Sequence, residues 1–157
     1  LFHFLYELTN FNEFVGYFSP INESIFQHTK IAFVPYILFS IIEAFFVDIG
    51  LTRFITVKSI ISLSVFAFII VFYYTYTGIL GYDVPWLNIV SVLLFIILAT
   101  YSSYKLLTGK RKIERLFFLA FPLFLVAFIC MLVFTHTPPE IPLFFDPLNK
   151  TYSAVKK

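Results

Sequence analysis

The chain has 157 residues, of which 60% are hydrophobic, 22% aromatic and only 13% charged. A water-soluble domain carries about 25% charged residues, so this composition excludes a soluble globule, and its high hydrophobicity excludes a disordered chain. The net charge of +2, without a basic patch on a soluble surface, excludes nucleic acid as a partner. We therefore expect a multi-pass protein of the cell membrane, whose first partner is the lipid bilayer.

The N-terminal part predicts one partial and one complete span. Residues 1–8 are apolar but too few to cross a bilayer, so we interpret them as the end of a first span whose start precedes the numbered chain. Ser19 and Pro20, followed by Glu23, are typical of a helix start with Ser19 as the N-cap. They predict an amphipathic stretch that leads into a span, together covering 19–47.

Three further spans are expected at 59–78, 85–106 and 116–135, each near the length of about 20 residues that crosses the hydrocarbon. The connections between them are short, so consecutive helices should pack as antiparallel neighbours. Residues 136–157 are rich in proline and predict an extended tail that folds back over the bundle as a lid. The predicted fold class is all-α: one integral domain with four full spans, a truncated N-terminal span and a Pro-rich tail.

The charged residues predict the orientation of these spans. Seven of the eleven Lys and Arg residues are Arg53, Lys58 and the five basic residues between 105 and 115. The positive-inside rule therefore assigns the loop 107–115 to the cytoplasm. The tail, six of the nine acids and all three histidines are then predicted to be extracytoplasmic.

The extracytoplasmic side contains the residues best suited to chemistry. The spacing of four between His3 and Glu7 places both on one helix face, where they can bind one divalent metal or simply end a helix among the lipid headgroups. His28 lies on an apolar stripe of its helix. It is interpreted as a metal ligand, a general base or a hydrogen-bonded residue without a catalytic role. The candidate catalytic residues are His3, Glu7, Glu23, His28 and His136, and the candidate metal ligands are His3, Glu7 and His28.

Five other polar residues are candidates for a supporting role: Asn22, Glu43, Tyr74, Tyr76 and Asp146. Glu43 interrupts an apolar run, so it is either functional or paired with Arg53 or Lys58 near the cytoplasmic boundary. The tyrosines fit an aromatic belt at the membrane surface, with some hydroxyls bonded across the bundle. The lid is expected to bring Asp146 near the histidines.

Four motifs carry a resemblance to a known family. They are His3-Phe4-Leu5-Tyr6-Glu7, Phe18-Ser19-Pro20-Ile21-Asn22-Glu23-Ser24, Tyr74-Thr75-Tyr76-Thr77-Gly78 and Ile141-Pro142-Leu143-Phe144-Phe145-Asp146-Pro147. In these motifs, which extend over nearly the whole sequence, the chain resembles a family of small prokaryotic multi-spanning membrane proteins of unknown function. The resemblance implies a five-span protein and no particular activity, but its motifs coincide with the extracytoplasmic polar residues.

Three functions are compatible with the sequence. The first is a small, metal-assisted membrane enzyme that acts on a lipid-borne or membrane-proximal small molecule. The second is an ion or small-solute transporter or channel component that uses Glu43. The third is a non-catalytic accessory subunit of a membrane complex. A homo-oligomer is compatible with each of them.

Overall fold

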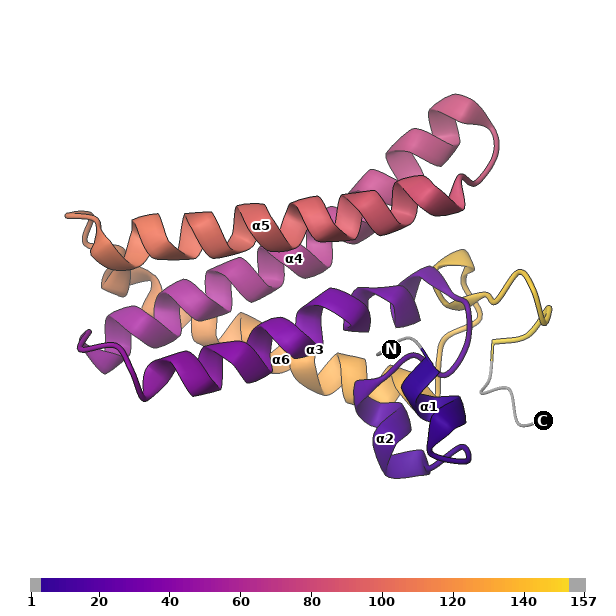
Figure 1. The fold of residues 1–157 in the computed structure, drawn as a ribbon, viewed down its shortest axis with the longest axis horizontal. Helices are drawn as coiled ribbons and strands as arrows, with labels where there is room; N and C mark the ends of the chain where they lie inside the picture. The colour runs from indigo at the N-terminus through magenta and orange to yellow at the C-terminus, as the bar shows by residue number, and fades with distance from the viewer. Residues whose placement is uncertain (1–3, 153–157) are drawn as a thin grey trace.

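The computed structural model describes residues 4–152 and is built from helices (Figure 1). In chain order these are α1 (Leu5–Leu8), α2 (Glu13–Phe18), α3 (Ile25–Ala44), α4 (Leu51–Leu80), α5 (Pro85–Thr108), the 3₁₀ turn η2 (Ile113–Leu116), α6 (Phe117–His136) and the 3₁₀ turn η3 (Pro142–Phe144). Within the described residues, four helical segments are long and apolar enough to cross a membrane: α3, α4, α5, and η2 together with α6. The predicted class, an all-α bundle of four membrane-spanning helices, is confirmed.

Helix α4 is the centre of the bundle, because α3, α5 and α6 all pack against it. Its buried residues Val57, Ile61, Val65 and Ile69 recur at every fourth position, so they line one helix face toward α3 and α5. A second core joins α3, α6 and the tail through Phe26, Phe33, Val34, Met131 and Phe144. Small polar residues on α4, such as the buried Ser59 and Ser62, let neighbouring backbones approach closely.

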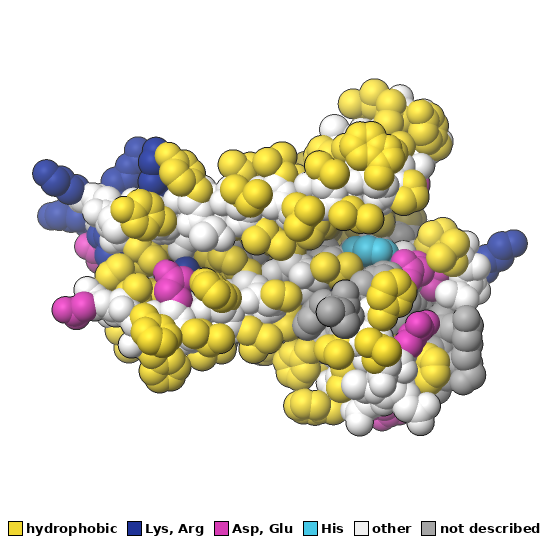
Figure 2. Space-filling model, viewed as in Figure 1, with side chains coloured by type: hydrophobic (Ala, Val, Ile, Leu, Met, Phe, Trp, Pro, Cys, Tyr) yellow, Lys and Arg dark blue, Asp and Glu magenta, His cyan; other side chains and the backbone are white. Residues whose placement is uncertain are grey.

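The outward faces of α5 and α6 are apolar and exposed. Only 17% of the α5 span and 11% of the α6 span are buried inside the protein. Figure 2 shows hydrophobic side chains over most of the visible surface, with most of the visible Lys and Arg side chains at one end. We call this end, formed by residues 45–58 and 105–116, the basic end, and the opposite end, formed by residues 4–24, 81–84 and 137–152, the tail end. The apolar outward faces of α5 and α6 are stable in lipid rather than in water.

Arg53 organises the basic end. Its guanidinium donates to the backbone carbonyls of Leu106, Leu107, Gly109 and Arg111 and lies 3.4 Å from the Glu114 carboxylate. Arg53 therefore satisfies carbonyls that the end of α5 leaves without intrahelical partners. The helix that contains the span predicted at 59–78 begins eight residues earlier, at Leu51, and includes Arg53 and Lys58, both of which have partners in the protein.

One prediction near the N-terminus also needs correction. The helix expected to start at Ser19 starts at Ile25, with Ser24 as its N-cap. Ser19 instead follows the end of α2, a helix that the sequence reading did not predict. A Ser-Pro pair fits both ends of a helix, because proline is common after a C-cap as well as at the first helical position. Of residues 1–8, the described part contains the single turn α1, so the truncated first span stays a prediction.

The tail lies against the bundle, as its apolar side chains predict. Phe144 is buried and packs on Phe26 of α3 and Phe134 of α6, with ring centroids 4.5 and 5.5 Å apart. The tail is not extended throughout, because Pro142–Phe144 form the turn η3. This packing places Asp146 beside the segment that precedes α3.

Candidate functional site

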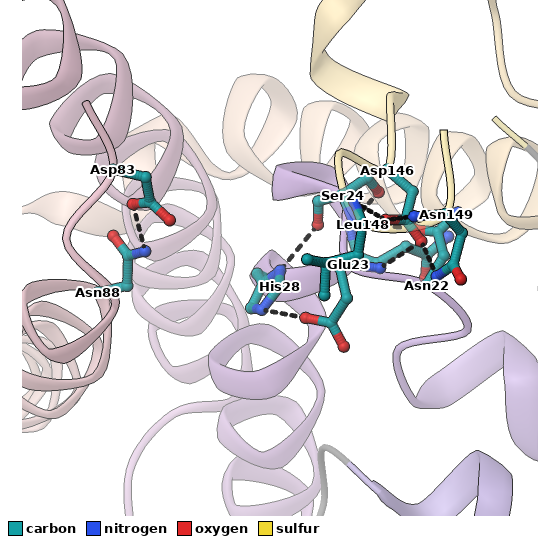
Figure 3. Close-up of polar contacts among 10 residues, drawn as sticks. Asn22, Glu23, Ser24, His28, Asp83, Asn88, Asp146, Leu148 and Asn149 are labelled. Atoms are coloured by element: carbon teal, nitrogen blue, oxygen red, sulfur yellow. Dashed lines mark hydrogen bonds and ion pairs between the residues drawn. The ribbon is translucent and has the colours of Figure 1, made fainter. Parts of the chain in front are cut away.

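The polar residues of the tail end meet around Asp146, whose exposed fraction is 0%. Its carboxylate accepts hydrogen bonds from the backbone N–H groups of Glu23, Leu148 and Asn149, at 3.2, 2.8 and 3.1 Å. The side-chain amide of Asn149 donates a fourth bond at 2.9 Å. Asp146 thus ties the tail to the turn before α3 (Figure 3). We call Asn22, Glu23, Ser24, His28, Asp146 and Asn149 the tail-end cluster.

The surroundings of Asp146 favour its charged form. Burial alone raises the pKa of this carboxyl, but the hydrogen bonds from Asn149, Glu23 and Leu148 outweigh burial and lower the pKa below its ordinary value of 3.8. The carboxylate is therefore ionised at neutral pH. Its charge is held by four donors and serves to fix the tail.

His28 and Glu23 form a pair beside this link. The His28 Nδ1 atom lies 2.9 Å from the Ser24 carbonyl oxygen, and because a carbonyl only accepts, Nδ1 carries a proton. The Nε2 atom then faces the Glu23 carboxylate at 3.4 Å. The two side chains are 30% and 33% exposed, which leaves the pair accessible from outside.

A pocket of about 220 Å³ adjoins the pair. Three segments supply its walls: Phe4, Tyr6, Glu7 and Phe11 from the N-terminal part, Pro20, Ile21, Asn22 and Glu23 from the turn, and Leu148 and Asn149 from the tail. The acids in this lining are Glu7 and Glu23. Tyr6 is 2% exposed, and its hydroxyl has no hydrogen-bond partner among residues 4–152.

Lys30 of α3 stabilises the chain next to the pocket wall. Its exposed fraction is 0%, and its ammonium donates to the carbonyls of Gly16 at 2.9 Å and Ser19 at 3.3 Å. Gly16 must lack a side chain, because a Cβ there would lie 2.9 Å from Ile21 and 3.0 Å from Tyr6. Lys30 therefore holds the end of α2 against Tyr6 and Ile21, two residues that line the pocket.

Lys30→Met is expected to loosen the end of α2 and the turn that follows it. Methionine fills a similar volume but leaves two buried carbonyls without a donor, at a cost of about 2 kcal/mol. Hydrogen exchange measured by mass spectrometry in detergent should therefore become faster between residues 16 and 24. Lys150→Met, at an exposed tail position, is the matched control. Unchanged exchange in the Lys30 variant would show that α2 is held by packing alone.

The remaining candidates lie elsewhere. His136 packs against Tyr17 of α2, with ring centroids 4.5 Å apart, whereas His28 contacts Glu23. Tyr76 donates to Asp83, and the Asn88 amide donates to the same carboxylate at 2.9 Å. This group closes the α4–α5 turn and lies apart from the tail-end cluster (Figure 3). Tyr74 is 42% exposed. His3 lies outside the described residues.

Glu43 is paired, as one of its two sequence interpretations predicts. Lys58 of α4 donates to its carboxylate at 2.6 Å and to the Ser103 hydroxyl of α5 at 2.8 Å. The Lys58 ammonium also lies 5.3 Å from the ring centre of Tyr36 and 5.4 Å from that of Phe54. Three helices thus meet at one ion pair near the basic end, far along α3 from the tail-end cluster.

For the candidate metal site, residues 4–152 contain no group of three or more His, Cys, Asp and Glu side chains arranged to hold a metal ion. The structure does bring together Glu23, His28 and Asp146 through α3 and the tail, and Glu7 and Glu23 through the pocket. Sequence reasoning missed Tyr6, Lys30 and Asn149, whose roles depend on contacts between distant segments. The glycine at position 16 was the one local signal of a close approach.

Comparison with known proteins gives a family but no activity. Residues 1–154 match the family described as "Family of unknown function (DUF6512)". The search of curated proteins and the search of solved structures gave no match.

Proposed function

The chain belongs to this family of unknown function, and we propose that it is a membrane-embedded protein that binds a small cationic molecule in the pocket at its tail end. The observation that carries this proposal is that the charged residues described in the pocket lining are the two acids Glu7 and Glu23. Carboxylates are ligands of hard cations and also bind ammonium groups. The distribution of basic residues supports an extracytoplasmic position for this pocket.

An enzymatic role for the same pocket is favoured by the His28–Glu23 pair. The Ser24 carbonyl fixes the imidazole through Nδ1 and leaves Nε2 facing the Glu23 carboxylate, which is a geometry suited to general acid–base catalysis. A divalent metal held by the Glu7 and Glu23 carboxylates would polarise a lipid-borne or membrane-proximal substrate for hydrolysis or group transfer. Glu23 lines the pocket and contacts His28, which links binding with acid–base chemistry.

Transport through Glu43 and an accessory role are the alternatives. For transport, Glu43 would have to exchange Lys58 for a passing cation, and its present contact at 2.6 Å opposes that exchange. An accessory role would use the exposed apolar faces of α5 and α6 against a partner subunit or a second copy.

Calorimetric titration of the purified chain with Mn²⁺ and, separately, with ethanolamine tests the binding proposal. We expect saturable binding of at least one cation, weakened at least tenfold by Glu7→Gln and by Glu23→Gln. Glu140→Gln removes an exposed tail carboxylate outside the pocket, so it should leave the affinity unchanged. Absence of binding by both cations, or equal affinities in all variants, would refute a cation site.

A further inference from the structure

A second pocket, of about 350 Å³, opens between α3, α4 and α6 near the basic end. Its lining is mostly apolar and includes Ile41, Phe45, Phe54 and Phe121, with Lys58 at one wall. Ile41 and Phe45 are 54% and 83% exposed, so the pocket is open on the side of the bundle that faces lipid. An apolar pocket of this kind does not hold ordered water, because it lacks the polar partners that water needs.

Positive charge lies at the same end of the bundle. The connection from α5 to α6 contains Lys110, Arg111, Lys112 and Arg115, against a single acid, Glu114. Because η2, within this connection, packs against both α4 and α6, the basic segment lies over two of the three helices that form the pocket. Clusters of basic residues next to a membrane span attract anionic lipid headgroups.

We propose that this pocket binds an acyl chain of an anionic phospholipid whose headgroup contacts the basic segment. The apolar walls match a hydrocarbon chain, and the neighbouring positive charge selects an anionic headgroup over a zwitterionic one. The site lies at the opposite end of the bundle from the pocket lined by Glu7 and Glu23, so it is independent of the function proposed there.

Tryptophan quenching by brominated lipids tests this site. Trp86, the single tryptophan, is first replaced by phenylalanine, and Phe121→Trp then places a reporter in the pocket. Phe118→Trp is the matched control, since Phe118 lies on the same helix three residues away and is 88% exposed to lipid. In phosphatidylcholine vesicles containing increasing brominated phosphatidylglycerol, the pocket reporter should reach half of its maximal quenching at a lipid fraction at least tenfold below that for the control reporter.

A larger side chain at an exposed lining position tests whether the preferential quenching by phosphatidylglycerol arises from lipid bound in the pocket. Ala44→Leu enlarges a lining residue and should abolish the preferential quenching, whereas Ala67→Leu, on an exposed part of α4 outside the pocket, should retain it. Equal quenching of the two reporters would refute a bound lipid. Equal preference for brominated phosphatidylcholine would refute headgroup selection. Protection of the Phe121→Trp reporter from both lipids would show that protein, such as a second copy, fills the pocket.

Discussion

Lys58→Met is expected to destabilise the bundle by about 3 kcal/mol, because removing one partner of a buried ion pair leaves the other charge without compensation. Lys58 is 8% exposed and connects Glu43 of α3 with Ser103 of α5. Without the ammonium, Glu43 must take up a proton or remain charged among apolar side chains. The free energy of unfolding, measured by titration with sodium dodecyl sulfate in mixed micelles, reports this loss.

The double variant Glu43→Leu/Lys58→Met is expected to recover most of the lost stability, because it removes both charges together. Lys110→Met is the control, since Lys110 is exposed and a change at such a position shifts stability by less than about 0.5 kcal/mol. If Lys58→Met behaves like the control, the ion pair does not hold the three helices together. If the double variant is less stable than Lys58→Met, removing both charges together does not restore stability, and the two residues do not stabilise the bundle as a pair.

The sequence was sufficient for the fold class and for the existence of the four spans. A helix that lies in lipid needs about 20 apolar residues, and this requirement leaves a strong signal in the sequence. The ends of the spans were harder to predict, because a charge such as Arg53 or Lys58 indicates a loop unless its partner is known. In this bundle the partners are backbone carbonyls and Glu43, which belong to other helices.

The candidate site was predictable only in part, for the same reason. Position along the chain placed Glu23, His28 and Asp146 at one end, but it could not show that Asp146 bonds to a backbone N–H 123 residues away. The role of Lys30 could not be predicted, because its two acceptors are backbone carbonyls, which every residue has and which therefore leave no mark in a sequence. The structure also gives other candidates partners of their own, since His136 packs on Tyr17 and Asp83 accepts a hydrogen bond from Asn88.

Asp146→Ala is expected to release the tail from the bundle. The change removes the acceptor of four hydrogen bonds, and the loss of several bonds to a buried charge costs about 3 kcal/mol of docking free energy. A nitroxide attached through Leu148→Cys, in a Cys130→Ser background, reports this release, because Leu148 is 75% exposed. At neutral pH the electron paramagnetic resonance spectrum should change from immobilised to mobile when Asp146 is replaced.

The same probe should reveal a dependence on pH that belongs to Asp146. Because folding lowers the pKa of this carboxyl, the docking free energy it provides is fully present well above pH 3.8 and is lost as the pH falls through the lowered value. The unmodified tail should therefore become mobile only in acid. Asp146→Asn retains one acceptor oxygen but does not titrate, so its tail should be partly mobile at every pH.

Glu140→Gln controls for the other tail carboxylate and should leave the acid transition in place. If the tail stays immobilised in Asp146→Ala, the packing of Phe144 on Phe26 holds it without the carboxylate. If the tail is released and cation binding by the Glu7–Glu23 pocket is lost with it, the segment containing Leu148 and Asn149 is a required wall of that pocket. Asp146 would then act on the site from a distance, through the position of the tail, while Glu23 acts on the ligand directly.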